Sequence, residues 1–102
     1  MAKNKMRPIH PGEVLREDFL VPLDMSVNAL AQRLHVPARR MNEIVRGQRG
    51  VTPETALRLA AFFGGEATSW LNLQQTYDLK IAESEAAVRI AQEVRPLAQA
   101  QS

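Results

Sequence analysis

The fold is decided by residues 26–46, which read SVNALAQRLHVPARRMNEIVR. Ser26 offers a hydroxyl that can accept a hydrogen bond from a free amide in the first turn of a helix, and apolar residues then recur at helical spacing. Residues 35–37 (HVP) interrupt that helix, and a second helix is expected over 38–45. Two short helices joined by a turn of three or four residues form a helix-turn-helix unit.

The second helix of this unit separates its side chains by chemistry. Met41, Ile44 and Val45 share one face and are expected to pack inward. The outward side chains are polar or charged: Arg39, Arg40, Asn42, Glu43 and Arg46. In helix-turn-helix proteins the second helix lies in the DNA major groove, and its N-terminal half meets the base edges. The separation therefore predicts a recognition helix.

Three residues at the start of this helix suit base reading. Arginine can donate two hydrogen bonds to guanine, and asparagine can pair with adenine. Arg39 and Asn42 lie one helical turn apart on one face, and the methyl group of Ala38 can touch a thymine methyl. We assign base reading to Ala38, Arg39 and Asn42.

Other polar residues of the unit suit contact with DNA phosphates. A helix N-terminus can hold a phosphate through its free amides, which adds a second role to the Ser26 cap. The residues assigned to the DNA backbone are Ser26, Arg33, Arg40, Arg46, Gln48 and Arg49. Taken singly, Arg39, Arg40 and Asn42 could equally be ordinary surface residues. Glu43 is expected to be a solvated charge or the partner of Arg39, Arg40 or Arg46. Their placement within the unit favours the DNA interpretation.

Charge is distributed unevenly along the chain. The formal net charge is +2, but residues 1–58 carry ten Lys or Arg and six Asp or Glu, whereas residues 59–102 carry three and five. The densest basic cluster falls within 33–49, with Glu43 as its one acidic member. A local basic stripe on a nearly neutral chain is typical of phosphate contact, although a solvated face would look the same.

The remaining segments also predict helices. One is expected over 13–20 and ended by Pro22, and one from Pro53 to Phe63 with Thr52 as its cap. Helical propensity then runs from about residue 67 to Pro96, either as one long helix or as two with a bend near Glu83. No segment predicts a strand. The fold class is therefore all-α, a bundle of five to six helices.

These elements divide the chain into four parts: a basic N-terminal arm (1–12), a DNA-binding domain (13–66), a C-terminal helical segment (67–97) and a frayed tail (98–102). A palindromic site is read by two copies of such a protein about one DNA turn apart. The C-terminal segment offers apolar side chains to a second copy, which predicts a homodimer through Leu73, Tyr77, Ile81, Val88 and Ile90. The same side chains could instead cover the first four helices.

Several function classes are disfavoured. The chain has no cysteine and two histidines, at 10 and 35, which is too little for a metal site or a catalytic triad. It has no glycine-rich phosphate loop, no apolar run near the roughly 20 residues of a membrane span, and no signal-peptide pattern. We expect a cytoplasmic protein with no enzymatic activity, cofactor, metal or membrane association.

Three stretches resemble the Xre/Cro-type helix-turn-helix family of phage repressors: SVNALAQRL (26–34), IVRG (44–47) and TPETALRLA (52–60). Two flanking stretches, RPIHPGEVL (7–15) and WLNLQQTYDL (70–79), resemble the HigA (VapI-like) antitoxins. The resemblance covers about residues 7–82 and implies a lambda-repressor-like fold. We interpret the flanking stretches as structural: HPGE as a turn with a favourable first-turn acid, and Trp70, Leu73 and Tyr77 as a core-facing helix face.

The resemblance also implies a function. HigA-like proteins bind and suppress HigB, a RelE-like mRNA endonuclease, and repress their shared operon as homodimers on palindromic operator DNA. Arg39, Arg40 and Asn42 match the family's recognition-helix positions. Ala38 departs from the glutamine common in phage repressors, so the operator sequence does not follow. Two alternatives stay open: a stand-alone Xre-family repressor, and a protein-binding module that no longer recognises DNA.

Overall fold

The central helices begin where their capping residues stand. In the computed structural model, which describes residues 7–100, α3 spans Val27–Leu34 and the Ser26 hydroxyl accepts a 3.0 Å hydrogen bond from the Ala29 amide. Helix α4 spans Ala38–Val45, directly after Pro37. Helix α5 spans Pro53–Phe63 and begins with the Thr52 hydroxyl as its cap. The sequence prediction of these helices is confirmed.

Three helix ends share one chain-reversing geometry. At Asp24, His35 and Gly47 the backbone adopts a positive φ, of 52°, 57° and 76°. In each case the amide of the following residue donates a hydrogen bond to the carbonyl five positions before it, as from Val36 to Ala31 at 3.0 Å. This is the Schellman arrangement, which satisfies carbonyls at a helix end. It allows the short turns that fold α3 and α4 against each other.

The first helical run is longer than predicted. It comprises α1 (Pro11–Val14), a π-helical segment η2 (Leu15–Leu20) and α2 (Val21–Leu23), without a break. The imidazole of His10 caps its start by accepting a 2.9 Å hydrogen bond from the Gly12 amide. The run continues past Pro22, so the predictions of a start at Glu13 and an end before Pro22 are wrong. In a π segment the backbone hydrogen bonds join residues five apart instead of four. This shift lets the helix pass Pro22, which has no backbone amide to donate.

The core lies among α1, η2, α3, α4 and α5 and is closed by the start of α6. Its fully buried side chains include Leu15, Leu30, Met41, Ile44 and Leu59. On one side of this core the ring of Phe19 lies between two others. Its centre is 4.7 Å from the ring centre of Phe63 and 5.4 Å from that of Trp70. These contacts join the first helical run to α5 and α6.

Helix α1 approaches α4 through a glycine. A side chain at Gly12 would overlap the Ile44 carbonyl oxygen and lie 2.9 Å from the Val45 Cα. Only glycine allows the two backbones to come this close. The contact fixes the end of α4 against the first helix.

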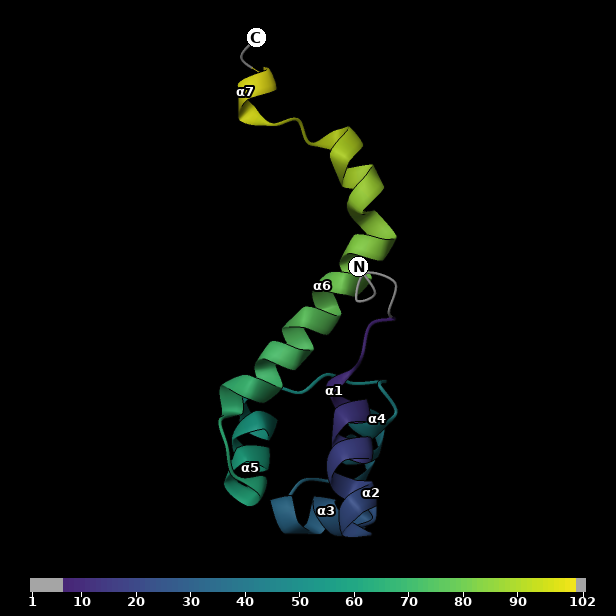
Figure 1. Cartoon of the computed structure of the whole chain (residues 1–102), viewed down its shortest axis with the longest axis vertical. Coiled ribbons are helices and arrows are strands. Elements are labelled where there is room, and N and C mark those ends of the chain that lie inside the picture. The colour runs from purple at the N-terminus through teal and green to yellow at the C-terminus, as the bar shows by residue number, and fades with distance from the viewer. Residues whose placement is uncertain (1–6, 101–102) are drawn as a thin grey trace.

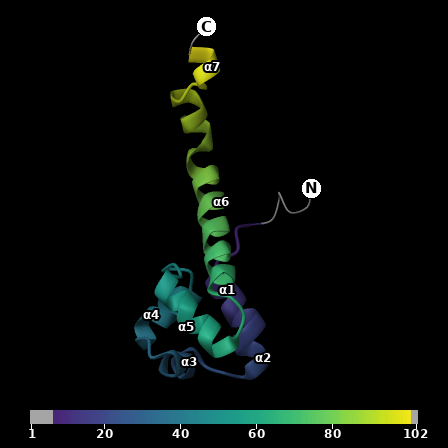
Figure 2. The ribbon, with the colours of Figure 1, turned by 90° about the vertical axis from the view of Figure 1, so that its left-hand side faces the viewer.

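Helix α6 is one unbroken helix, Ala67–Glu93, followed by the short α7, Leu97–Ala100. This decides between the one-helix and two-helix alternatives. Its first half packs on α5 and α1, and its second half projects from the rest of the chain (Figures 1 and 2). The described residues extend 59 × 28 × 24 Å, with a radius of gyration of 17.5 Å against about 13 Å for a compact chain of this length.

The structure describes most of the four predicted parts. Residues 1–6 of the predicted arm and residues 101–102 of the predicted tail lie outside the described residues. Within 7–100 every regular element is helical. No helix there combines the length and the apolar character that a membrane crossing requires.

Candidate DNA interface

Helix α4 is presented to solvent by the packing of its opposite face. Met41 and Ile44 are fully buried and Val45 is nearly so, which confirms the predicted inward face. The α3–α4 turn adds Val36, whose side chain is also buried. With this face anchored in the core, the other face of α4 is left accessible, with Arg39 exposed and Arg40, Asn42 and Glu43 half-buried, as recognition of a DNA groove requires.

The residues assigned to base reading lie together at the start of α4. Ala38 and Arg39 are exposed, and Asn42 is half-buried. The Asn42 amide group donates to the Ala38 carbonyl oxygen at 2.9 Å and to the Asn28 side-chain oxygen at 3.0 Å. These bonds orient Asn42 before any ligand arrives. Both use its side-chain nitrogen as the donor, so its side-chain oxygen takes part in neither.

Glu43 links two of the predicted DNA-contacting arginines. Its carboxylate accepts a 2.8 Å hydrogen bond from Arg49 and a 3.2 Å one from Arg39. These two bonds, that from Arg49 first, hold the pKa of Glu43 below its usual range. Arg39 is one of the partners expected for Glu43, whereas Arg49 was not among the expected ones and neither Arg40 nor Arg46 bonds to Glu43 in the described residues.

Arg40 and Arg49 line one side of a recess whose other side is the start of α5. The remaining lining residues are Gly50, Thr52, Pro53, Glu54 and Thr55. Arg46 and Gln48 are exposed at the end of α4 and in the loop that follows it. The structure thus gathers four of the six residues assigned to the DNA backbone around the end of α4 and the α4–α5 loop.

The other two backbone assignments lie on α3. Ser26 is exposed, and its hydroxyl caps the helix. The guanidinium of Arg33 lies over the ring of Phe62 on α5, 5.7 Å from the ring centre. Such a cation–π contact occupies one face of Arg33. Arg33 therefore has a structural neighbour that the sequence did not reveal.

Two polar residues of α3 border the candidate interface and were missed by sequence reasoning. Asn28 bonds to Asn42, and Gln32 lines a cleft with Asn28, His35 and Ala38 between α3 and α4. Both are exposed. Their place one turn apart on the polar face of α3 was the available signal. That this face borders the start of α4 is a result of the tertiary fold.

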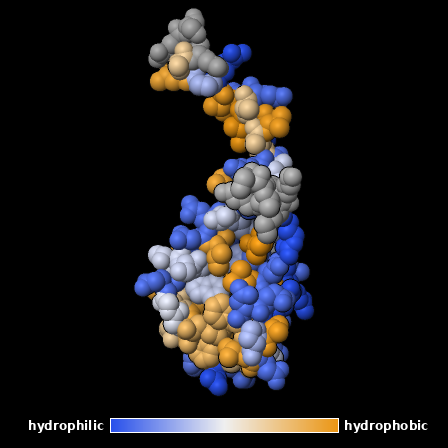
Figure 3. Space-filling view, in the orientation of Figure 1, coloured by the Kyte–Doolittle hydropathy of each residue, from blue (hydrophilic) through white to orange (hydrophobic). Residues whose placement is uncertain are grey.

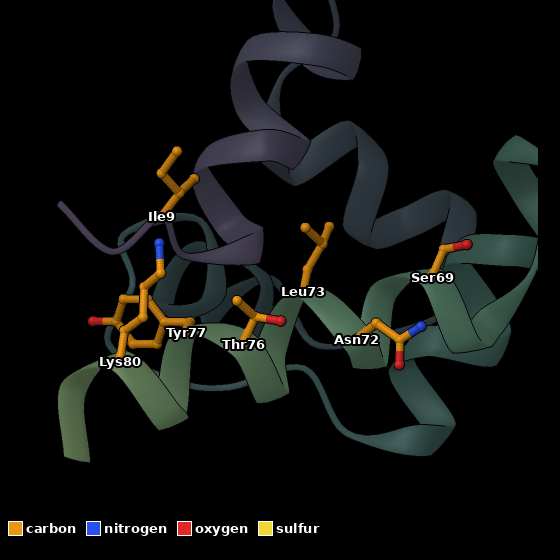
Figure 4. A pocket seen from close by; sticks show the side chains of 7 residues that line it. All are labelled: Ile9, Ser69, Asn72, Leu73, Thr76, Tyr77 and Lys80. Carbon is orange, nitrogen blue, oxygen red and sulfur yellow. The ribbon is translucent and has the colours of Figure 1, made fainter. Parts of the chain in front are cut away.

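The five residues predicted at a dimer interface lie along α6. Leu73, Tyr77 and Ile81 are half-buried, whereas Val88 is 74% and Ile90 48% exposed. Leu73 and Tyr77 also line a groove of about 310 Å³ with Ile9, Ser69, Asn72, Thr76 and Lys80. Figure 4 shows Ile9 on the N-terminal segment and the remaining residues along α6 around this groove. Among the described residues, none of α6 beyond Leu73 belongs to the hydrophobic core or to the partly buried side chains packed against it.

The described residues contain no group of three or more His, Cys, Asp or Glu side chains that could hold a metal ion. The recess between α4 and α5 is lined by two arginines, two threonines and Glu54, and the cleft between α3 and α4 by Asn28, Gln32 and His35 beside apolar residues. Such side chains suit hydrogen-bonding ligands. The arrangement is that of a binding surface.

Comparison with known proteins agrees with this geometry. The helix-turn-helix family matches residues 15–71. Virulence-associated protein I of Dichelobacter nodosus is 60% identical over 84 residues, which span 82% of this chain and 78% of that protein. The Pseudomonas aeruginosa antitoxin HigA, solved with the higBA promoter, is 46% identical with a TM-score of 0.87, over 89% of this chain and 99% of the other. The chain belongs to the HigA (VapI-like) family of helix-turn-helix proteins.

A further solved relative fits the same family. The antitoxin GraA in complex with its operator is 42% identical, with a TM-score of 0.85, over 90% of this chain and 93% of the other. The predicted resemblance and the all-helical fold are thus confirmed. The HigA family is one of DNA-binding antitoxins and regulators and is not a family of enzymes.

Proposed function

We propose that this HigA-family chain is the antitoxin of a toxin–antitoxin module, which represses its own operon and neutralises a HigB-like, RelE-like mRNA-cleaving toxin. The observation that carries the proposal is the free face of α4, with Ala38, Arg39 and Asn42 at its start and the core beneath it. The activity is binding without catalysis or cofactor, and it takes place in the cytoplasm, where the operator DNA and the toxin's mRNA substrate are.

On DNA, α4 enters the major groove. Arg39 donates to guanine, the side-chain oxygen of Asn42 accepts from the adenine N6 amino group, and Ala38 meets a thymine methyl. Arg40, Arg46, Gln48 and Arg49, with Ser26 and Arg33 on α3, contact the phosphates on either side. Guanine competes with Glu43 for Arg39 and a phosphate competes with Glu43 for Arg49, so both arginines exchange a half-buried carboxylate partner for DNA.

In this proposal the protein binds a palindromic operator as a homodimer. In the half of α6 that projects from the rest of the chain, Val88 and Ile90 are exposed and Ile81 is half-buried, so these side chains are available for a second copy. Figure 3 shows hydrophobic surface along this projecting half of the helix. Ile81 and Val88 lie with Leu73 and Tyr77 on one side of α6 over several turns, whereas Ile90 lies on a different side of the helix. Two recognition helices joined in this way can read two half-sites.

The testing experiment is a gel-shift titration on the DNA upstream of the protein's own gene, at two salt concentrations and against a scrambled duplex. The double variant Arg39→Ala, Asn42→Ala is expected to lose sequence preference while remaining folded. Each lost base contact costs about 1–3 kcal/mol, so the loss of two lowers affinity for the upstream DNA by about 30-fold or more. The control is Arg89→Ala, an exposed arginine on the projecting half of α6.

Unchanged operator affinity in the double variant would remove the base-reading assignment. Equal weak binding of the wild type to both duplexes would favour a protein-binding module that does not recognise DNA. The toxin arm is tested by co-purification with the product of the adjacent gene and by relief of its mRNA cleavage. Operator binding without any such partner would favour the stand-alone repressor.

A further inference from the structure

The two flanking stretches of the sequence meet at one place in the fold. His10 of the HPGE stretch lies edge-on against Tyr77 of the WLNLQQTYDL stretch, with ring centres 4.9 Å apart. His10 is 7% exposed, and it also lies against Gly47, directly after α4. The junction therefore joins the N-terminal segment, α6 and the loop that follows the recognition helix.

Gln74 makes the direct hydrogen bond between α6 and this loop. Its side-chain oxygen accepts from the Val51 amide at 2.8 Å, and its side-chain nitrogen donates to the Asp78 carboxylate at 3.0 Å. Gly50 packs against the side-chain amide of Gln74: a Cβ atom at position 50 would lie 3.1 Å from the Gln74 Cδ. Gln74 is thus held at both ends and packed from a third side.

The loop held by Gln74 carries residues proposed to contact phosphates. Residues 46–51 connect α4 to α5 without forming a helix of their own, and they include Arg46, Gln48 and Arg49. Val51 is 5% exposed, so its amide has little access to water as a substitute partner. Without the Gln74 oxygen this buried donor is unsatisfied, and the loop has a reason to move.

We propose that Gln74 is a positioning residue for DNA binding, which fixes the 46–51 loop against α6 so that its basic side chains meet the phosphate backbone. Gln74 itself does not touch DNA. The inference rests on the proposed function and deepens it: the operator is recognised through α4, and α6 controls whether the adjoining loop contributes its phosphate contacts.

The test compares variants on the upstream duplex over a series of salt concentrations. Gln74→Leu keeps the approximate size of the side chain and removes the acceptor. We expect affinity to fall up to about tenfold, because the net worth of one hydrogen bond is about 0.5–1.5 kcal/mol. We also expect the slope of log affinity against log salt to become shallower by about 0.9 for each lost phosphate contact. Gln75→Leu, one exposed residue along the same helix, is the matched control.

Rescue separates positioning from general stabilisation. In the double variant Gln74→Glu, Asp78→Asn the carboxylate at 74 accepts from Val51, and the amide at 78 donates back to it. Net charge is preserved, and both affinity and salt slope are expected to return to wild type. Amide hydrogen exchange at Val51 gives a readout without DNA: faster in Gln74→Leu and restored in the double variant.

Two results would overturn the inference. The first is a Gln74→Leu variant with wild-type affinity and salt slope. The second is a rescued Val51 exchange rate in the double variant without any recovery of DNA binding. In both cases the wild type still prefers its upstream DNA, so the proposed function stands. A wild type without that preference would overturn the proposed function, and the inference with it.

Discussion

The molecule has two regions that use apolar side chains in opposite ways. In the head, residues 10–73, most hydrophobic side chains form one buried cluster that reaches the first turns of α6, and Val21, Leu23 and Leu57 are the exposed exceptions among the large ones. In the stem, residues 79–97, Leu79, Val88, Ile90, Val94 and Leu97 are all exposed. The head buries most of its apolar side chains against one another. The stem keeps a helical backbone through local hydrogen bonds, but these apolar side chains are not buried against the rest of their own chain.

The largest difference is expected from the same substitution made in both regions. Ile44→Ala empties a site that is fully buried in the head, which should lower the free energy of unfolding by about 2–5 kcal/mol. Ile90→Ala in the stem should lower it by less than about 1 kcal/mol, because Ile90 is 48% exposed. Urea unfolding at low protein concentration measures both. Equal losses would show that the stem is packed as tightly as the head.

A second prediction concerns the contact that holds the recognition helix inside the head. Gly12→Ala places a methyl group against the Ile44 carbonyl oxygen, where the backbone must move to admit it. We expect a loss of about 1–3 kcal/mol in unfolding free energy and weaker operator binding, since α4 is displaced. Thermal unfolding and the gel-shift titration measure the two effects. The stem substitution Ala87→Ser, at an exposed position, should change neither.

A third prediction tests what covers the stem. If a second copy does so, the melting temperature rises with protein concentration, because dimerisation is linked to folding by mass action. Val88→Asp should abolish that rise and leave a monomer in sedimentation. Glu85→Gln, also exposed on the stem, should keep it. A melting temperature independent of concentration in the wild type would contradict the dimer through α6.

The smallest effect is expected from pH, at the junction between head and α6. Burial lowers the pKa of His10 below 6.5, against the weaker opposing effects of the Asp78 carboxylate and the Arg49 backbone. Between the lowered value and 6.5 the unfolded chain binds more protons than the folded one, so stability falls as pH falls through this window. Protonation also ends the acceptance of the Gly12 amide by His10.

The two histidines provide the control for this effect. His10→Asn keeps a side-chain acceptor for the α1 cap and should flatten the pH dependence of the melting temperature below 6.5. His35→Asn changes the exposed histidine with positive φ, a conformation that asparagine tolerates, and should leave the dependence in place. An unchanged dependence in His10→Asn would show that another group is responsible.

What could be predicted from sequence follows the range of the interactions involved. Helices α3, α4 and α5 were predictable because their limits are set locally, by Ser26, Pro37 and Thr52 and by the glycine after α4. The start of the first helix was missed because its cap is a histidine, which is not among the usual capping residues. Its passage through Pro22 depends on a π segment that leaves no simple sequence pattern.

The candidate site divides in the same way. The outward face of α4 follows from helical periodicity, so Arg39 and Asn42 were identified. The bond from Asn42 to Asn28 and the bond from Val51 to Gln74 join residues 14 and 23 positions apart. No local pattern encodes such pairs, because they arise only when the helices pack.

The division of α4 into a buried and a free face has an evolutionary consequence. Residues that hold the helix in place, Met41 and Ile44, are separate from those proposed to meet the bases, Ala38, Arg39 and Asn42. A lineage can therefore exchange its preferred operator by surface substitutions that leave folding untouched. Duplicated genes built on this scaffold can become insulated from one another within one cell through a few such changes.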